Sequence, residues 1–215
     1  EIKNPLTPIQ LTIDRLKNKY SNELKFDQKE DFTKSLKIIG KQIKQIENLV
    51  NEFSDFARMP KPILKDNNVI SLIKDNINLI KELDHNIEIN FNSNKSEIIL
   101  NSDSEQLSRV FFNLIKNSIE SIQEKKDNNY YFKGKINIIL NNNVSDIDFI
   151  IIDNGLGFEI FADNIKNILN PYFTTKEKGT GLGLAIVNKT INDHNGSIEF
   201  IPIDDGAKIQ IKFIK

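Results

Sequence analysis

The stretch that decides the fold is DNGLGF at residues 153–158, together with PYFTTK at 171–176 and GTGLGL at 179–184. Its two glycine clusters consist of Gly155 and Gly157, and of Gly179, Gly181 and Gly183. Glycine allows positive φ and a close approach of the backbone to a ligand, and the free N–H groups at a helix start favour an anion. Because the second cluster leads directly into an apolar helical pattern, these motifs predict a nucleotide site under a movable cover, with the polyphosphate near residues 179–183.

The composition narrows the class of protein. The 215-residue chain has 39% hydrophobic and 27% charged residues, which is ordinary for a globular protein. A net charge of −1 gives no electrostatic reason to expect nucleic acid as a partner. The absence of cysteine excludes disulfides and thiolate chemistry. No apolar run approaches the roughly 20 residues that span a bilayer.

Residues 1–20 and 32–53 carry apolar side chains at alternating intervals of four and three, which is the heptad pattern of packed helices. Pro5 and Pro8 interrupt the first seam, so we expect a bend near its start. The polar residues 21–29 are predicted to form the turn. Because such a hairpin has too small a core to stand alone, we predict a homodimer with a four-helix bundle. The alternative is a hairpin packed against its own second domain.

A stiff Met-Pro-Lys-Pro linker at residues 59–62 marks the boundary between two predicted domains, residues 1–59 and 60–215. In the second domain we expect helices over 69–83, 103–124 and 181–194, and strands over 87–91, 97–100, 136–140, 147–152, 197–203 and 207–213. Residues 125–133 are expected to be a mobile connection. The predicted fold class is α+β, in which a helical hairpin precedes an α/β sandwich with a mostly antiparallel sheet and helices on one face.

Three polar side chains in this second domain suggest chemistry. Asn113 and Asn117 lie one turn apart on a predicted helix and share a face, where two carboxamides suit a hydrated Mg²⁺ that bridges to phosphates. Alternatively, they cap the helix or face solvent. Asp153 ends an apolar strand, where its carboxylate can accept a hydrogen bond from an exocyclic amine such as that of adenine. An Asp-Asn-Gly sequence at a strand end is also a common turn.

Four motifs in this order resemble the N, G1, F and G2 boxes of sensor histidine kinases. They are NLIKNS at 113–118, DNGLGF at 153–158, PYFTTK at 171–176 and GTGLGL at 179–184. The resemblance covers residues 60–215 and implies the Bergerat ATP-binding fold, which topoisomerase, heat-shock chaperone and mismatch-repair ATPases share. The first ten residues, EIKNPLTPIQ, resemble a dimerisation and histidine-phosphotransfer helix. Together with the PYFTTK motif, their sequence is most similar to that of the nitrogen-regulation kinases of the NtrY type.

The resemblance implies that ATP and Mg²⁺ bind to the second domain. By this resemblance, Asn117 is the main Mg²⁺ ligand, Asn113 assists it, and Asp153 binds adenine. The other residues that it places at the nucleotide pocket or its lid are Gly155, Gly157, Lys176, Gly179, Thr180, Gly181 and Gly183. For Lys176, near the phosphates, the alternative is a solvated charge on the lid.

The resemblance places the phosphoacceptor histidine directly before Glu1, where this chain begins. Glu1 then orients or deprotonates that imidazole, and Asn4 positions water when the enzyme acts as a phosphatase. Neither His85, between a predicted helix and strand, nor His194, where a capping role is expected, replaces this histidine. We therefore expect the chain to bind ATP with Mg²⁺ without phosphorylating itself at the usual position.

The resemblance also implies a partner and a location. The partner is the receiver domain of a response regulator, which docks on the helical bundle and accepts the phosphoryl group on an aspartate. Because the chain starts inside a predicted helix and without methionine, we expect a cytoplasmic fragment. We expect the full-length protein to be anchored in the inner membrane through upstream segments.

Residue 113 discriminates between classes of Bergerat protein. The hydrolysing relatives place a glutamate there as a base, whereas Asn113 cannot accept a proton at neutral pH. Asparagine therefore favours phosphoryl transfer to an imidazole, which depends on positioning and Mg²⁺. Two alternatives stay open: an ATP-hydrolysing module of the chaperone or topoisomerase type, and a dimeric scaffold or pseudokinase that uses nucleotide as a conformational ligand.

Overall fold

The computed structural model describes residues 3–20, 26–83, 87–127, 131–158, 165–174 and 179–215. The chain divides into two compact units, one of Glu1–Met59 with the short segment that ends at Thr180, and one of Pro60–Thr174 with Gly181–Lys215. None of the described helices combines the length and apolar character needed to cross a membrane.

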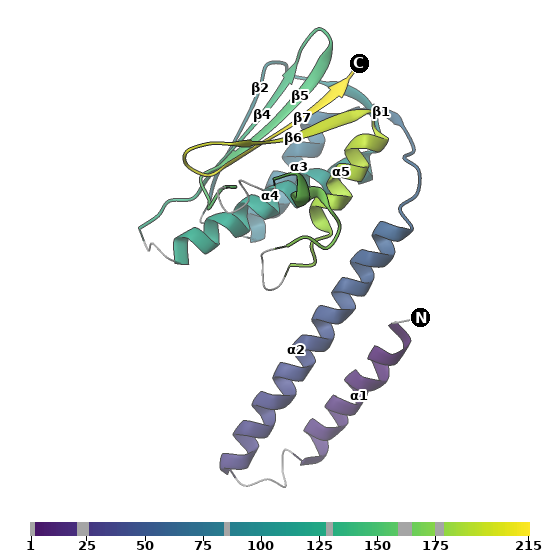
Figure 1. Ribbon diagram of the computed structural model, residues 1–215, viewed down its shortest axis with the longest axis vertical. Coiled ribbons are helices and arrows are strands. Elements are labelled where there is room, and N and C mark those ends of the chain that lie inside the picture. The colour runs from purple at the N-terminus through teal and green to yellow at the C-terminus, as the bar shows by residue number, and fades with distance from the viewer. Residues whose placement is uncertain (1–2, 21–25, 84–86, 128–130, 159–164, 175–178) are drawn as a thin grey trace. The chain divides into compact units, whose positions relative to one another are not determined.

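The first unit is a hairpin of α1 (Lys3–Tyr20) and α2 (Phe26–Ala57), seen in Figure 1 as two antiparallel helices. Pro8 lies inside α1, and its carbonyl accepts a hydrogen bond from Thr12 Oγ1 at 2.8 Å. Residues 26–29, expected in the turn, belong to α2. The polar residues 27–29 suggested a turn, but glutamine and lysine are good helix formers.

The heptad pattern of the hairpin divides into two sets of residues. Ile13, Leu36 and Ile43 are buried between the two helices, with Leu6 and Phe32 packed against them. The alternate heptad positions stay between 37% and 46% exposed; they are Ile9, Leu16, Ile39, Ile46 and Phe53. One set therefore closes the hairpin, and the other forms an apolar stripe on its surface.

The described residues of the second unit form nine regular elements besides a short strand pair. They are α3 (Val69–Leu83), β2 (Glu88–Ser93), α4 (Ser104–Asp127), β4 (Lys135–Asn142), β5 (Asp146–Asp153), the 3-10 helix η2 (Ile165–Leu169), α5 (Gly183–Asp193), β6 (Gly196–Pro202) and β7 (Ala207–Ile214). The strand pair is β1 (Lys65–Asn68) with β3 (Ile99–Ser102). The main sheet has the order β2-β4-β5-β7-β6, and only β2 and β4 are parallel. This arrangement confirms the predicted sandwich with a mostly antiparallel sheet.

Two features of this unit differ from the sequence prediction. β1 was not expected, because its Lys-Asp-Asn-Asn sequence lacks the β-branched and aromatic residues that favour strands. α4 continues to Asp127, so Lys125 belongs to a helix and not to a mobile connection. Lysine and glutamate are good helix formers, and the run of charges at residues 124–127 extends the helix.

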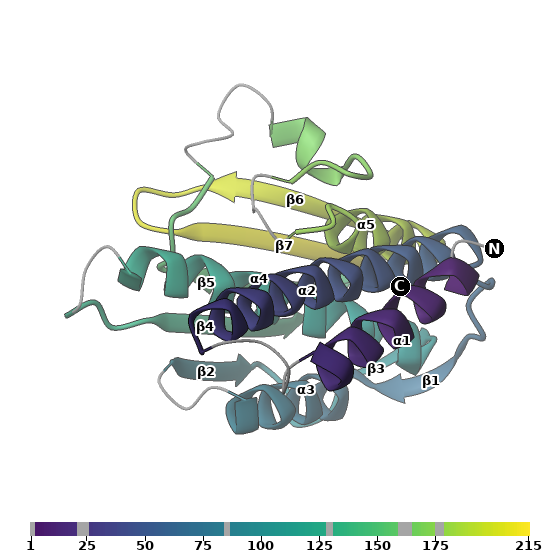
Figure 2. The same cartoon turned by 90° about the horizontal axis from the view of Figure 1, so that it is seen from below.

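The core lies between the sheet and one layer of helices. α4 packs between α3 and α5, and Figure 2 shows all three helices across one face of the sheet. Alternate residues of the central strands point into this layer, as Ile136, Ile138 and Leu140 of β4 do. Phe111 of α4 stacks against Phe149 of β5, with ring centroids 4.9 Å apart. This packing fixes α4, which carries two of the predicted site residues, against the strand that ends at Asp153.

Candidate nucleotide-binding site

Asp153 joins the end of β5 to α4. It is the last residue of that strand, and only 5% of it is exposed. Its Oδ2 accepts a hydrogen bond from Ser118 Oγ at 2.7 Å, and its Oδ1 accepts one from the Gly155 N–H at 2.9 Å. Ser118 directly follows Asn117, so the helix of the asparagines and the DNG turn are tied together at this carboxylate.

The electrostatic environment of Asp153 favours added hydrogen-bond donors. Burial raises the pKa of Asp153, because a carboxylate away from water loses its hydration. The hydrogen bonds from Ser118, Gly155 and Ala207 lower this pKa, and so does the charge of Lys125, but they offset burial only in part. A ligand N–H group that donates to this carboxylate would stabilise its charged form. The site is therefore suited to the exocyclic amine of a base.

The DNG turn is pressed against α4 and the β6–β7 turn. A Cβ on Gly155 would lie 2.3 Å from Ser121 Oγ, which also accepts the Leu156 N–H at 2.9 Å. Gly157 has a φ of +76°, and a Cβ there would lie 2.4 Å from the Gly206 carbonyl oxygen. Both predicted glycines are thus required by close packing within the protein.

Asn154 attaches the same turn to the beginning of β4. Its Oδ1 accepts the Lys135 N–H at 2.7 Å, and its Nδ2 donates to the Lys133 carbonyl at 2.9 Å. On the opposite side of the turn, a Cβ on Gly206 would lie 1.8 Å from the Asp153 carbonyl oxygen. The backbone around Asp153 is therefore held by α4, by β4 and by the β6–β7 turn.

Asn113 and Asn117 occupy successive turns of α4, and both are half-buried. Neither carboxamide is hydrogen-bonded to another described residue. A pair of half-buried amide oxygens without partners among the described residues fits the ligand preference of Mg²⁺. The two residues are therefore free to serve as the predicted ligands.

The first turn of α5 fits a phosphate group. The side chain of Leu182, the residue before this helix, makes no capping hydrogen bond, and the N–H groups of a first helical turn favour an anion. A Cβ on Gly183 would meet no atom within 4 Å, so the protein itself leaves space at this glycine. Gly181 has a φ of +67°, and its carbonyl accepts the Tyr172 N–H at 3.0 Å. The G2 segment is thus packed on the PYF segment before α5 begins.

The remaining predicted site residues are described to different extents. Gly179 is exposed and Thr180 is half-buried, directly before Gly181. Lys176 and Glu1 lie outside the described residues. Asn4 belongs to α1, and only its backbone is described.

Sequence reasoning missed four residues that build this site: Ser118, Ser121, Lys125 and Gly206. The two serines gave a usable signal, because they lie three residues apart on a helix face that is otherwise apolar. Lys125 and Gly206 gave none, since their contacts join segments that are far apart in the sequence. His194 does cap a helix, as expected, and stands at the C-terminal end of α5.

The placement of α4 and α5 on one face of the sheet, beside the end of its central strand β5, is that of the Bergerat ATP-binding fold. Residues 102–215 match the family described as "Histidine kinase-, DNA gyrase B-, and HSP90-like ATPase", and residues 1–62 match the "His Kinase A (phospho-acceptor) domain". The chain belongs to this ATPase family, and with its phospho-acceptor domain it forms the kinase core of a two-component sensor histidine kinase.

Individual relatives support the same assignment. The putative sensor histidine kinase NtrY-like of Rickettsia prowazekii (strain Madrid E) is 38% identical over 99% of this chain and 34% of its own length. The nitrogen regulation protein NtrY of Azorhizobium caulinodans is 38% identical over 99% of this chain and 27% of its own length. The chain thus spans about a third or less of the length of these relatives. The sequence identity confirms the predicted similarity to the NtrY type.

A solved structure supports the fold. It is histidine kinase ThkA in complex with response regulator protein TrrA, which matches 100% of this chain and 60% of the solved chain. The TM-score is 0.68 and the sequence identity is 21%. The helical hairpin followed by an α/β sandwich is therefore the arrangement of a known histidine kinase.

Proposed function

We propose that this chain binds ATP with Mg²⁺ in the second unit and donates the γ-phosphoryl group to a histidine, rather than to water. The observation that carries the proposal is Asn113 on α4, with an amide where hydrolysing relatives have a carboxylate base. An amide can bind a metal ion but cannot take a proton from water. Asparagine at this position therefore supports transfer to an acceptor that is already nucleophilic, such as an imidazole.

Each described part of the site has a role in this proposal. Asp153 accepts the exocyclic amine of adenine, and the uncapped start of α5 at Gly183 holds the phosphates. Asn117 and Asn113 hold Mg²⁺, which when bound neutralises charge on the phosphates. The chain contributes orientation and charge neutralisation, which supply most of the catalysis in phosphoryl transfer.

We also propose a homodimer that docks a response regulator. The apolar stripe of the hairpin supports the dimer, because its five residues stay partly exposed although they follow the heptad repeat of both helices. The ThkA–TrrA complex supports a response regulator as the partner. The NtrY relatives support a role in nitrogen regulation.

The test adds one histidine before Glu1 and supplies ATP labelled on the γ-phosphate. We expect acid-labile, base-stable label on the protein, and we expect Asn117→Ala to abolish it. ATP binding without any label would contradict the kinase and favour the scaffold. Fast steady-state phosphate release that Asn113→Ala abolishes would instead favour the hydrolase.

A further inference from the structure

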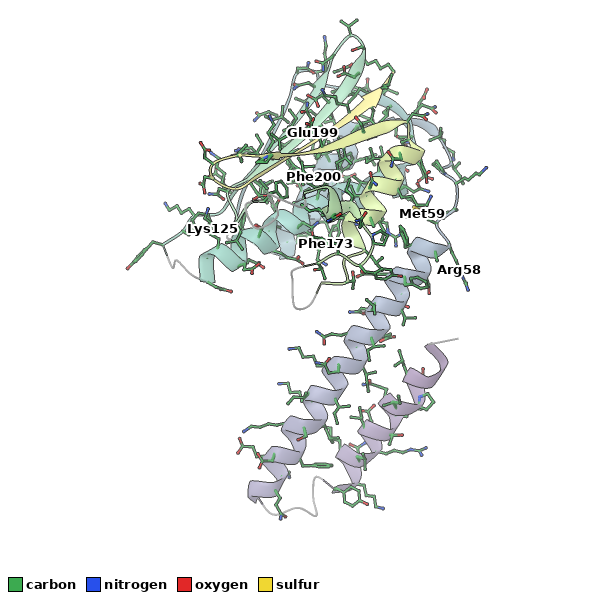
Figure 3. All side chains as sticks on the ribbon, viewed as in Figure 1. Arg58, Met59, Lys125, Phe173, Glu199 and Phe200 are labelled. Carbon is green, nitrogen blue, oxygen red and sulfur yellow. The ribbon has the colours of Figure 1, made fainter. Side chains whose placement is uncertain are left out.

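We propose that Lys125 is a positioning residue of the nucleotide site, which holds the DNG turn in the conformation that lets Asp153 select adenine. The inference rests on the proposed binding of ATP and deepens it. Lys125 lies two turns of α4 beyond Asn117, and Figure 3 shows it near the C-terminal end of that helix.

All three donors of the Lys125 ammonium group are used within the protein. Nζ donates to the carbonyl oxygens of Asn154 and Gly155, each at 2.9 Å, and to Asp205 Oδ1 at 2.5 Å. The ammonium also lies 4.9 Å from the centre of the Phe132 ring. Only 28% of the side chain is exposed. Lys125 thus connects α4, the DNG turn and the β6–β7 turn, whereas the ammonium group of a surface lysine usually contacts water.

These contacts set the direction of two peptide groups. In a trans peptide the N–H points opposite to the carbonyl, so carbonyls that face Lys125 turn the following N–H groups away from it. Those N–H groups are the ones of Gly155, which donates to Asp153 Oδ1 at 2.9 Å, and of Leu156, which donates to Ser121 Oγ at 2.9 Å. Lys125 thus orients the peptide that holds the Asp153 carboxylate and the peptide that docks the turn on α4.

Lys125 also connects the DNG turn to the β6–β7 turn. A cleft of about 190 Å³ lies between these turns, and its lining includes Lys125, Gly155, Leu156 and residues 203–206. The Asp205 ion pair bridges this cleft. The two turns already touch at Gly157 and Gly206, and Lys125 adds a second connection between them across the cleft.

The test measures nucleotide affinity of the whole chain for ATP and for GTP, each with Mg²⁺, by calorimetric titration. Guanine carries an oxygen where adenine has its amine, so a fixed Asp153 carboxylate disfavours it. We expect Lys125→Met to raise the Kd for ATP about tenfold, equivalent to about 1.4 kcal/mol, and to change the Kd for GTP much less. The preference for adenine should fall accordingly.

The matched control is Lys126→Met, which removes the same charge from the next residue of α4. Lys126 is half-buried and is not hydrogen-bonded to another described residue. The Kd values of the Lys126→Met chain for ATP and GTP should therefore stay within twofold of those of the parent. Asp205→Asn leaves both carbonyl contacts of Lys125 intact and should give a smaller shift in the same direction. This variant keeps the proposal testable if Lys125→Met does not fold cooperatively.

Two results would overturn the positioning role. One is equal loss of ATP and GTP affinity in folded Lys125→Met, because that indicates general damage to the site. The other is a folded Lys125→Met chain whose Kd values for ATP and GTP equal those of the Lys126→Met chain. If Lys125→Met does not fold, the same result for Asp205→Asn would overturn the role. A parent chain that binds neither nucleotide would instead contradict the proposed function.

Discussion

Asp153 is a residue whose folded environment opposes its charge. Its pKa is raised by burial, so between the unfolded value near 3.8 and the higher folded value the native state binds more protons than the unfolded state. The free energy of unfolding therefore falls as pH rises through this window. Above the folded pKa, the full cost of burying the ionised carboxylate is present. A buried carboxylate that destabilises the empty site is consistent with a role in binding.

Replacing Asp153 by asparagine should separate stability from binding. We expect Asp153→Asn to raise the free energy of unfolding of the ligand-free chain at pH 7 by on the order of 1 kcal/mol, because a neutral amide is buried at lower cost. ATP affinity should fall at least about tenfold, because a charge-assisted hydrogen bond is lost. Urea unfolding between pH 4 and pH 8 and ATP titration provide the measurements. Parallel stability profiles for parent and variant would contradict the assigned cause.

The candidate site residues could be identified from the sequence, but their supports could not. Asn113 and Asn117 lie one turn apart on a helix, so their closeness follows from local structure, and Asp153 was identified from its own short motif. Ser118 lies 35 residues from Asp153, and Lys125 lies 80 residues from Asp205. Such pairs form only when α4 packs on the sheet, and no periodicity along the chain encodes them.

At the level of elements, Asp103 is the junction that places α4. Its Oδ1 accepts the N–H groups of Glu105 and Gln106 and thereby caps this helix, while its Oδ2 accepts the Ile63 N–H at 2.9 Å. The Asp103 N–H donates to His194 Nε2 at 2.9 Å, at the end of α5. Since this nitrogen accepts, Nδ1 carries the proton that is donated to the Thr190 carbonyl at 2.8 Å. The junction therefore aligns α4 with α5, the two helices of the site.

Removal of this cap should show a defined pH dependence. Burial raises the pKa of Asp103, but the backbone donors of Ile63, Gln106 and Glu105 outweigh it, so the pKa lies below its usual value of 3.8. The carboxylate thus stabilises the fold above the unfolded pKa, and this contribution is lost as pH falls through the folded pKa. We expect Asp103→Ala to lower the free energy of unfolding by about 1–2 kcal/mol at pH 7 and by clearly less near pH 3. Urea unfolding at both pH values measures this difference in free energy. A difference between parent and variant that does not change with pH would contradict the proposed role of the carboxylate.

Elements were predictable where apolar spacing was regular and not where polar residues determine the pairing. The buried alternation of β4 and the helical seam of α4 are visible in the sequence. The parallel pairing of β2 with β4 is not, because a strand's own pattern is the same in either direction. β1 pairs with β3 through four polar residues, which no hydrophobic pattern can indicate.

For the whole molecule, the apolar stripe on the hairpin indicates how two copies assemble. Ile39 and Ile46 of α2 are 46% and 45% exposed, although they keep the heptad register of the buried Leu36 and Ile43. A chain that repeats partly exposed isoleucine every seven residues gains from burying it against another helix, by roughly 1 kcal/mol for each side chain, since about half of each is already buried. The homodimer stays a prediction that this stripe makes testable.

A charge in the stripe should dissociate the dimer. We expect Ile46→Glu to raise the dimer dissociation constant at least about a hundredfold, because two isoleucines are lost and two carboxylates face an apolar contact. The control is Ile38→Glu on the same helix, since Ile38 is 62% exposed and outside the heptad positions, and it should leave the dimer intact. Sedimentation equilibrium over a range of concentrations measures both. A parent chain that stays monomeric throughout, or equal effects of the two substitutions, would show that this stripe is not the dimer contact.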